Sequence, residues 1–215
     1  MQADNKQLRT RVKVCGMSQP DNVAQVVACG VDAIGMILHA NSPRTISLEQ
    51  AQLVRQVVPA FVSLVGVFVD CDAQQINDYA QTIGLDLIQL HGNESNAFGK
   101  GLSKPFIKAI RAQTKEQVEQ QVTQYPDARA FLLDPYVKGQ HGGTGKHLDL
   151  SLWPSDCQKP LILAGGLSPD IVSGAIREVA PFAVDLNSGI EDSPGIKNIG
   201  LLKQALTQIS LTQVS

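Results

Sequence analysis

No apolar run in this sequence approaches the roughly 18 residues that a membrane-spanning helix needs, so we expect no membrane association. Basic residues are not in excess either. The 18 Lys and Arg against 20 Asp and Glu leave a net charge of −2, which predicts no surface for nucleic acid or anionic membrane. The first eleven residues are polar and contain no apolar stretch typical of a secretory signal. We therefore interpret residues 1–11 as a polar N-terminal extension.

Cysteine is scarce, and its four copies stand far apart at positions 15, 29, 71 and 157. The absence of a C-x-x-C pair argues against a zinc ribbon or a dithiol redox site and fits a reducing cytoplasm. What the chain does have is 43% hydrophobic residues over 215 positions, which suits one globular domain across residues 1–215. We expect a cytoplasmic protein.

Short apolar runs of strand length alternate with helical patterns along the whole chain. We expect a first helix that starts after Ser18, its cap, and is closed by Cys29-Gly30. We also expect a capping box formed by Ser47 and Gln50, and a last helix over 196–209. The expected strands lie at 12–15, 33–38, 61–68, 86–90, 106–109, 130–133, 160–164 and 182–186. The other expected helices lie at 47–58, 73–83, 114–125, 148–153 and 169–179, with a short one after residue 94.

Strands separated by helices indicate βαβ units and a parallel sheet. Eight such units close into a (β/α)8 TIM barrel, for which 215 residues is compact but sufficient. A doubly wound open sheet is the alternative, but it usually contains fewer strands at this length. The sequence therefore predicts an α/β fold with a single (β/α)8 barrel domain.

In such a barrel the reactive face lies at the carboxyl ends of the strands. Two of the predicted strand ends carry small residues, Gly165-Gly166 after the seventh and Ser188-Gly189 after the eighth. Loops at these two places often bind phosphate through backbone N–H groups, and glycine lets the backbone approach the anion closely. A tight turn is the alternative for Gly165-Gly166, but both loops together favour a phosphate site.

The glycine-rich loop 139–147 is neither a P-loop nor a metal site by its pattern. Gln140 stands where a P-loop has glycine, and His147 stands where it has Ser or Thr after the lysine. His141 and His147 have no third clustered ligand, so we expect no metal. We interpret the segment as a flap over the barrel mouth.

Cys15 and Asp134 stand at the ends of the first and sixth strands, and Arg44 follows the second. A cysteine in this place is commonly core filler, a lone Asp before proline commonly caps a turn, and an arginine is commonly exposed. At opposed strand ends, however, a thiol and a desolvated carboxyl group can act as base and acid on a small substrate between them. Arg44 could then bind a carboxylate in bidentate fashion.

Six ordered motifs run through the chain: VKVCGM at 12–17, SPR at 42–44, QLHG at 89–92, GGTGK at 142–146, LAGGL at 163–167 and DLNSGIE at 185–191. Together they resemble the phosphoribosylanthranilate isomerase family of tryptophan biosynthesis. The resemblance covers the chain from the first strand to the last helix. It implies a (β/α)8 enzyme that needs no metal or organic cofactor and is a monomer or homodimer.

The resemblance also implies residue roles: Cys15 as general base, Asp134 as general acid, Arg44 facing the anthranilate carboxylate, and Gly165, Gly166, Ser188 and Gly189 around the phosphate. His91 and Asp185 fall in matching motifs and are counted as substrate-binding, Asp185 toward the ribose. The implied reaction is an Amadori rearrangement of N-(5-phosphoribosyl)anthranilate to 1-(2-carboxyphenylamino)-1-deoxyribulose 5-phosphate.

The chemistry requires a thiolate, and an ordinary thiol has a pKa of about 8.5. We place Lys13 on the opposite strand face from Cys15, so we expect no direct activation by that lysine. Some positions depart from the family pattern: His147, Leu148, Asp149 and Leu150 follow the GGTGK motif, and Asn187 replaces a more typical Ser. None of these departures touches Cys15, Asp134 or Arg44.

Two other functions remain open from the residues alone. One is a different phosphate-binding barrel enzyme, such as a lyase or epimerase of a phosphorylated sugar, which would keep the glycine loops without needing both Cys15 and Asp134. The other is a non-catalytic subunit that binds a phosphorylated metabolite. The presence of both an acid and a base counts against this second function.

Overall fold

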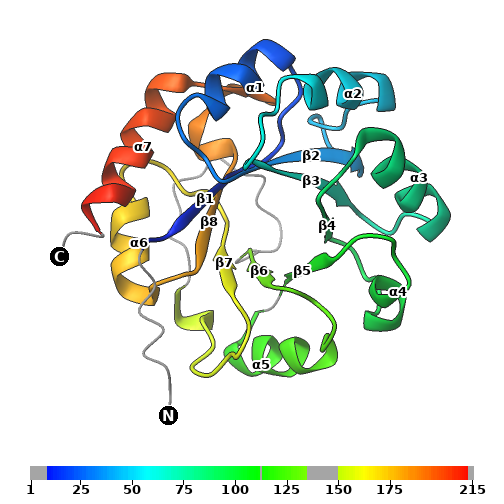
Figure 1. Ribbon diagram of the computed structural model, residues 1–215. Coiled ribbons are helices and arrows are strands. Elements are labelled where there is room, and N and C mark those ends of the chain that lie inside the picture. The colour runs from blue at the N-terminus through cyan, green and yellow to red at the C-terminus, as the bar shows by residue number, and fades with distance from the viewer. Residues whose placement is uncertain (1–8, 112, 135–149, 213–215) are drawn as a thin grey trace.

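The structure is a computed structural model that describes residues 9–111, 113–134 and 150–212. Its eight parallel strands close into one barrel, because β1 pairs with β8 as well as with β2 (Figure 1). The strands are β1 (Arg11–Val14), β2 (Ala33–His39), β3 (Ser63–Phe68), β4 (Leu87–Leu90), β5 (Phe106–Ile110), β6 (Phe131–Leu133), β7 (Leu161–Leu163) and β8 (Ala183–Leu186). The predicted (β/α)8 barrel is confirmed, and the open sheet is excluded.

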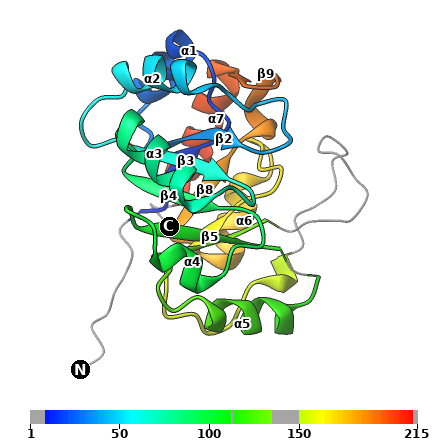
Figure 2. The same ribbon diagram turned by 90° about the vertical axis from the view of Figure 1, so that its right-hand side faces the viewer.

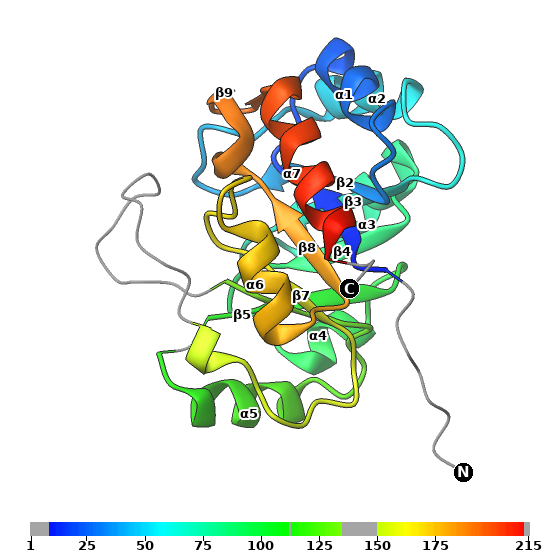
Figure 3. The same cartoon turned by 90° about the vertical axis from the view of Figure 1, so that its left-hand side faces the viewer.

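Helices surround the ring of strands on its outside. They are α1 (Pro20–Val27), α2 (Leu48–Gln56), α3 (Ala73–Ile83), α4 (Asn96–Lys100), α5 (Lys115–Gln124), α6 (Val172–Val179) and α7 (Ile199–Leu211). Figure 2 shows α2 to α5 following one another along one side, and Figure 3 shows α6 and α7 beside β8. The last helix, α7, packs against both α6 and α1. Within the described ranges, no helix is long and apolar enough to cross a membrane.

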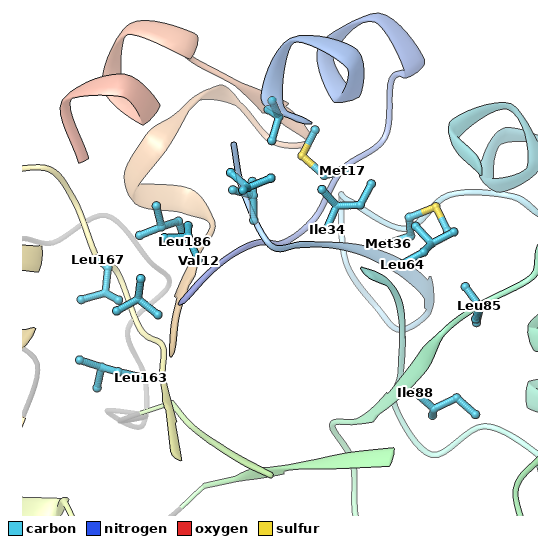
Figure 4. Close-up of a cluster of buried hydrophobic side chains, with 14 of the residues drawn as sticks. Val12, Met17, Ile34, Met36, Leu64, Leu85, Ile88, Leu163, Leu167 and Leu186 are labelled. Carbon is cyan, nitrogen blue, oxygen red and sulfur yellow. The ribbon is translucent and has the colours of Figure 1, made fainter. Parts of the chain in front are cut away.

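Two separate groups of buried side chains fill the fold. The larger lies between strands and helices and includes Ile34 and Met36 of β2, both without solvent exposure (Figure 4). Burying each such side chain contributes roughly 1.5–3 kcal/mol. The smaller group fills the inside of the barrel and consists of Ile107, Ala109, Ala130, Leu132, Ile162, Ala164 and Ala183. Side chains alternate between the two groups because successive strand residues point to opposite faces.

Because of the register between neighbouring strands, residues that point into the barrel lie side by side. Lys13 lies beside Ala33 on one side and Asp185 on the other. On the far side of the barrel, Gln89 lies beside Ile107. Stepping two residues along each strand keeps the same face, so Cys15, Gly35 and His91 also point inward at the carboxyl ends. Residues of the predicted polar site therefore share the inward face at the carboxyl ends of the strands.

Local signals account for several helix boundaries. Ser47 Oγ accepts from Gln50 N at 3.2 Å and Gln50 Oε1 accepts from Ser47 N at 3.0 Å, which confirms the predicted capping box. The helix α3 has the predicted bounds. It is capped by Asp72 at its start and ends where Gly84 adopts a left-handed conformation with φ of 74°.

Several boundaries differ from the prediction, among them the starts of three helices. Ser18 does not cap α1: its hydroxyl donates to Gly195 O at 2.9 Å, and Gln19 occupies the cap position. The helix α6 begins at Val172, three residues later than expected. The last helix begins at Ile199 with Asn198 as its cap, because the two preceding residues form β10 (Ile196–Lys197), which pairs with β9 (Glu191–Ser193).

Two predicted segments fall at the edge of what the structure describes. The glycine-rich loop 139–147, interpreted as a flap, lies outside the described residues. Of the helical piece expected at 148–153, the described part contains a 3₁₀ turn, η1 (Leu150–Leu152). Arg11, assigned from the sequence to the polar extension, is the first residue of β1.

Candidate active site

Cys15 lies directly after β1 with 4% of its surface exposed. Its backbone N–H donates to Leu186 O at 2.9 Å, so the pairing of β1 with β8 extends through this residue. Burial raises the pKa of the Cys15 thiol, and the nearby Lys13 ammonium group works against that shift. Asp185 adds to the rise, while Lys197 lowers the pKa. Burial is therefore the main influence on the ionisation of the thiol, and the surrounding charges modify it.

The expectation that Lys13 faces away from Cys15 is wrong. The two residues are two positions apart on one strand and therefore share a face. Lys13 Nζ lies 3.0 Å from both carboxylate oxygens of Asp185, and both side chains are less than a tenth exposed. Burial opposes the Lys13 charge, but Asp185 and Cys15 outweigh burial and raise the pKa of Lys13. A cation thus stands beside the thiol, where the sequence analysis found none.

Asp134 follows β6 and is partly buried. Leu132, two residues earlier, belongs to the inner core, so Asp134 continues the inward face of β6. Burial raises the pKa of Asp134, Arg111 lowers it, and Asp185 raises it further. Cys15 and Asp134 each follow the carboxyl end of a parallel strand and therefore lie at the same rim of the barrel. The charge of Asp185, within β8, acts on both. A carboxyl group that holds its proton more firmly than usual is suited to act as an acid.

His91 follows β4 and is held in its neutral form. Burial, followed by the charges of Arg111, Lys13 and Lys108, lowers the pKa of His91 to about 3. Its Nδ1 lies 2.9 Å from Gln89 Nε2, and because an amide nitrogen donates, the ring proton is assigned to Nε2. Among the described residues, Gln89 Oε1 is a buried acceptor without a partner.

The loop that carries His91 is tied down by a buried ion pair that sequence analysis missed. Lys108 Nζ lies 2.8 Å from Glu94 Oε2, and each side chain is 3% exposed. Glu94 also accepts from the backbone N–H groups of Asp70 at 2.8 Å and of Gly92 at 3.0 Å. Lys108 in turn donates to Gly92 O. The loops after β3 and β4 are thereby joined to Lys108 in the middle of β5.

Arg44 is bound to a carboxylate of the chain itself. Its Nε donates to Glu191 Oε1 at 2.9 Å and its Nη2 to Glu191 Oε2 at 2.6 Å. The position of a Cβ at Gly16 would lie 2.8 Å from Arg44 Cδ, so Arg44 packs against the loop that follows Cys15. Glu191 is within the sixth motif but was assigned no role from the sequence.

Lys197 is the second cation on Glu191. Its Nζ lies 2.6 Å from Glu191 Oε1 and 2.7 Å from Asn187 Oδ1, and its side chain is entirely buried. Burial lowers the pKa of Lys197, while Glu191 and Cys15 oppose that effect. From the sequence this residue was expected in a helix, so its place beside the end of β8 was not foreseen.

The loops after β7 and β8 approach each other through glycines. Gly165 and Gly166 have φ values of 96° and 61°, in the left-handed region that favours glycine. A Cβ at Gly189 would stand 2.1 Å from Leu167 O, so only glycine lets the two loops meet. No atom of the described structure lies within 4 Å of a Cβ built at Gly166, and Ser188 is exposed. Gly166 and Ser188 therefore face space that the described residues leave open.

These features define a (β/α)8 barrel with a thiol, a carboxyl group of raised pKa and two glycine loops at the carboxyl ends of its strands. The family model for N-(5'-phosphoribosyl)anthranilate (PRA) isomerase matches residues 12–208. The chain belongs to the N-(5'-phosphoribosyl)anthranilate isomerase family.

Individual relatives agree with the family match. The chain is 42% identical over 188 residues to N-(5'-phosphoribosyl)anthranilate isomerase of Pseudomonas fluorescens (strain Pf-5), covering 87% of this chain and 90% of that protein. The crystal structure of phosphoribosyl anthranilate isomerase from Thermotoga maritima superposes with a TM-score of 0.85 at 33% identity, covering 94% and 98% of the two chains. A structure of the isomerase with reduced 1-(o-carboxyphenylamino)-1-deoxyribulose 5-phosphate gives 0.81 at 32%, with the same coverage.

Proposed function

We propose that this site converts N-(5-phosphoribosyl)anthranilate to 1-(2-carboxyphenylamino)-1-deoxyribulose 5-phosphate, the isomerisation step of tryptophan biosynthesis. The observation that carries the proposal is the placement of Cys15 and Asp134 at one barrel rim, both under the influence of Asp185, in a chain of this family. The substrate and product are isomers, so the reaction moves protons within one molecule and consumes no oxidant or reductant.

Asp134 begins the reaction by protonating the ring oxygen of the ribose. The ring C–O bond breaks, a Schiff base forms between C1 and the anthranilate nitrogen, and the C2 proton becomes acidic. The Cys15 thiolate takes that proton and leaves an enolamine. The hydroxyl proton of the enolamine is then replaced by one at C1, which gives the ketone. The Cys15 thiol releases its proton to solvent and the Asp134 carboxylate takes one up, so that base and acid return to their starting forms.

The other residues bind the two ends of the substrate. Arg44 uses Nε and Nη2 for Glu191, which leaves the Nη1 edge of its guanidinium group for the anthranilate carboxylate. Gly165, Gly166, Ser188 and Gly189 receive the phosphate in the open space between their loops. His91 donates from Nε2 to a hydroxyl of the substrate, and Asp185 lies toward the ribose.

The test follows loss of substrate fluorescence with the wild type and two variants, Cys15→Ala and Asp134→Asn. Each variant is expected to lose about 10²–10⁴-fold in kcat, the usual contribution of general acid or base catalysis. Cys71→Ala is the matched control, because Cys71 is also buried but pairs with Gln75 on α3. Wild-type protein without turnover would refute the proposed reaction. Full turnover by either variant would refute the assigned roles and leave the reaction standing.

The same assay separates the alternatives. Neither a different phosphate-binding barrel enzyme nor a non-catalytic subunit would turn over this substrate, so turnover distinguishes the proposed reaction from both. We also propose a cytoplasmic location, in keeping with four free cysteines, and a monomer or homodimer without nucleic-acid partners.

A further inference from the structure

The inward position of β2 that faces Cys15 and Lys13 is a glycine. A Cβ at Gly35 would stand 2.9 Å from Cys15 Sγ and 3.0 Å from Lys13 Nζ. Because Lys13 pairs with Ala33, Gly35 lies one inward step further along β2, level with Cys15. Any side chain at position 35 would occupy the space in which the thiol and the ammonium group meet.

Lys13 is shared between two acidic groups. Its Nζ contacts both oxygens of Asp185 at 3.0 Å, on the β8 side of β1. On the β2 side it stands beside Cys15 over Gly35. The other charges that act on Cys15 are Lys197, beside the end of β8, and Arg44, after β2. Both of these cations are already bound to Glu191.

We propose that Lys13, packed against Gly35, is the counter-ion of the Cys15 thiolate, and that Asp185 competes with the thiolate for this ammonium group. The proposal rests on the proposed role of Cys15 as base. Lys13 is a positioning residue, because it neither gives nor takes a substrate proton. When the thiolate accepts the C2 proton, its negative charge is lost and the Lys13 ammonium group returns fully to Asp185.

This arrangement predicts opposite effects of two substitutions on one quantity, the pKa of the Cys15 thiol. Lys13→Met removes the cation and is expected to raise that pKa by about 1 unit or more, the usual effect of a charge at 4–6 Å. Asp185→Asn removes the competitor and is expected to lower it. A merely structural role for the ion pair would not give shifts of opposite sign.

The measurement is a pH titration of the ultraviolet absorbance of the thiolate in the intact protein, after subtraction of the same titration of Cys15→Ser. Lys108→Met is the matched control. It also removes a buried lysine from a carboxylate, Glu94, but Lys108 is not among the charges that act on Cys15. Its loss is expected to lower stability and leave the thiol pKa unchanged.

Gly35→Ala tests the same contact without leaving a charge unpaired. The three atoms nearest to the added methyl group belong to the side chains of Cys15 and Lys13 and none to the backbone, so the barrel is expected to fold while the two groups are pushed apart. We expect a raised thiol pKa and at least about tenfold lower kcat, with little change in KM. Gly66→Ala is its control, since the three atoms nearest to a Cβ there are apolar side-chain carbons of Leu85, Phe68 and Leu38.

The titration needs no substrate, so its outcome is independent of the proposed reaction. A thiol pKa that does not move in Lys13→Met, or in Gly35→Ala if the former fails to fold, overturns the proposal. A shift of the same sign in Lys13→Met and Asp185→Asn also overturns it. If Cys15→Ala keeps full activity, the role of Cys15 as base fails, while the titration still decides whether Lys13 is its counter-ion.

Discussion

Replacing Glu191 with glutamine removes the charge that holds two cations beside the active site. The carboxylate binds Arg44 Nη2 and Lys197 Nζ, each at 2.6 Å, and its side chain is 5% exposed. Lys197 is completely buried, and without Glu191 its Nζ keeps the hydrogen bond to Asn187 Oδ1 at 2.7 Å. Removing one partner of a buried pair costs about 3–5 kcal/mol. We expect the lower end, about 3 kcal/mol, because the glutamine oxygen can still accept one hydrogen bond.

The assay is urea unfolding followed by circular dichroism, with Asp192→Asn as control because Asp192 is exposed and pairs with Asn198. Adding Lys197→Met to Glu191→Gln is expected to recover part of the loss, since no buried charge then lacks a partner. A loss in Glu191→Gln below about 1 kcal/mol, or an equal loss in Asp192→Asn, would contradict the buried-pair account.

The same pair makes stability depend on pH in one direction. Burial works against the Glu191 charge, but Arg44 and Lys197 outweigh burial and lower the pKa of Glu191. A lowered pKa means that the carboxylate stabilises the fold above its unfolded pKa, and that this contribution is lost as the pH falls through the folded pKa. The stability difference between wild type and Glu191→Gln should therefore shrink in acid. A difference that grows in acid would contradict this sign.

The remaining predictions concern the phosphate loops and the pH dependence of activity. Gly166→Asp is expected to raise KM at least about tenfold by charge repulsion, and because Asp tolerates a φ of 61° the loop should keep its shape. Gly166→Asn, which has the same size without the charge, should raise KM less; equal values would count against a phosphate there. The active form needs Asp134 protonated and Cys15 ionised, although both pKa values are raised. A profile of kcat/KM against pH should therefore be level between these two pKa values and fall on both sides, and a single limb would refute the pairing.

Short-range patterns explain what could be predicted from the sequence. Apolar runs alternating with helical stripes identified all eight strands of the barrel, and Ser47 with Gln50 marked the start of α2. Each of these signals lies within a few residues of the element that it forms. Residues at strand ends could also be identified, because the carboxyl ends of parallel strands meet at one face.

Long-range pairings could not be read in the same way. The bond between Arg44 and Glu191 joins residues 147 positions apart, and no local pattern indicates it. Ile196 and Lys197 have the apolar periodicity of the helix that follows, but pairing with β9 placed them in a strand. The position of Lys13, by contrast, could have been predicted from the sequence. Residues two positions apart on β1 point to the same face, and Lys13 and Cys15 are two positions apart.

The central claim is that Cys15 removes the C2 proton, and a single-turnover experiment with substrate deuterated at C2 tests it most directly. With the wild type, deuterium should slow the loss of substrate fluorescence, because the C2 bond breaks in the catalysed step. With Cys15→Ala, the rate should fall about 10²–10⁴-fold while the reduced product analogue binds as before. A rate for Cys15→Ala within tenfold of wild type, with the isotope effect unchanged, would contradict the account.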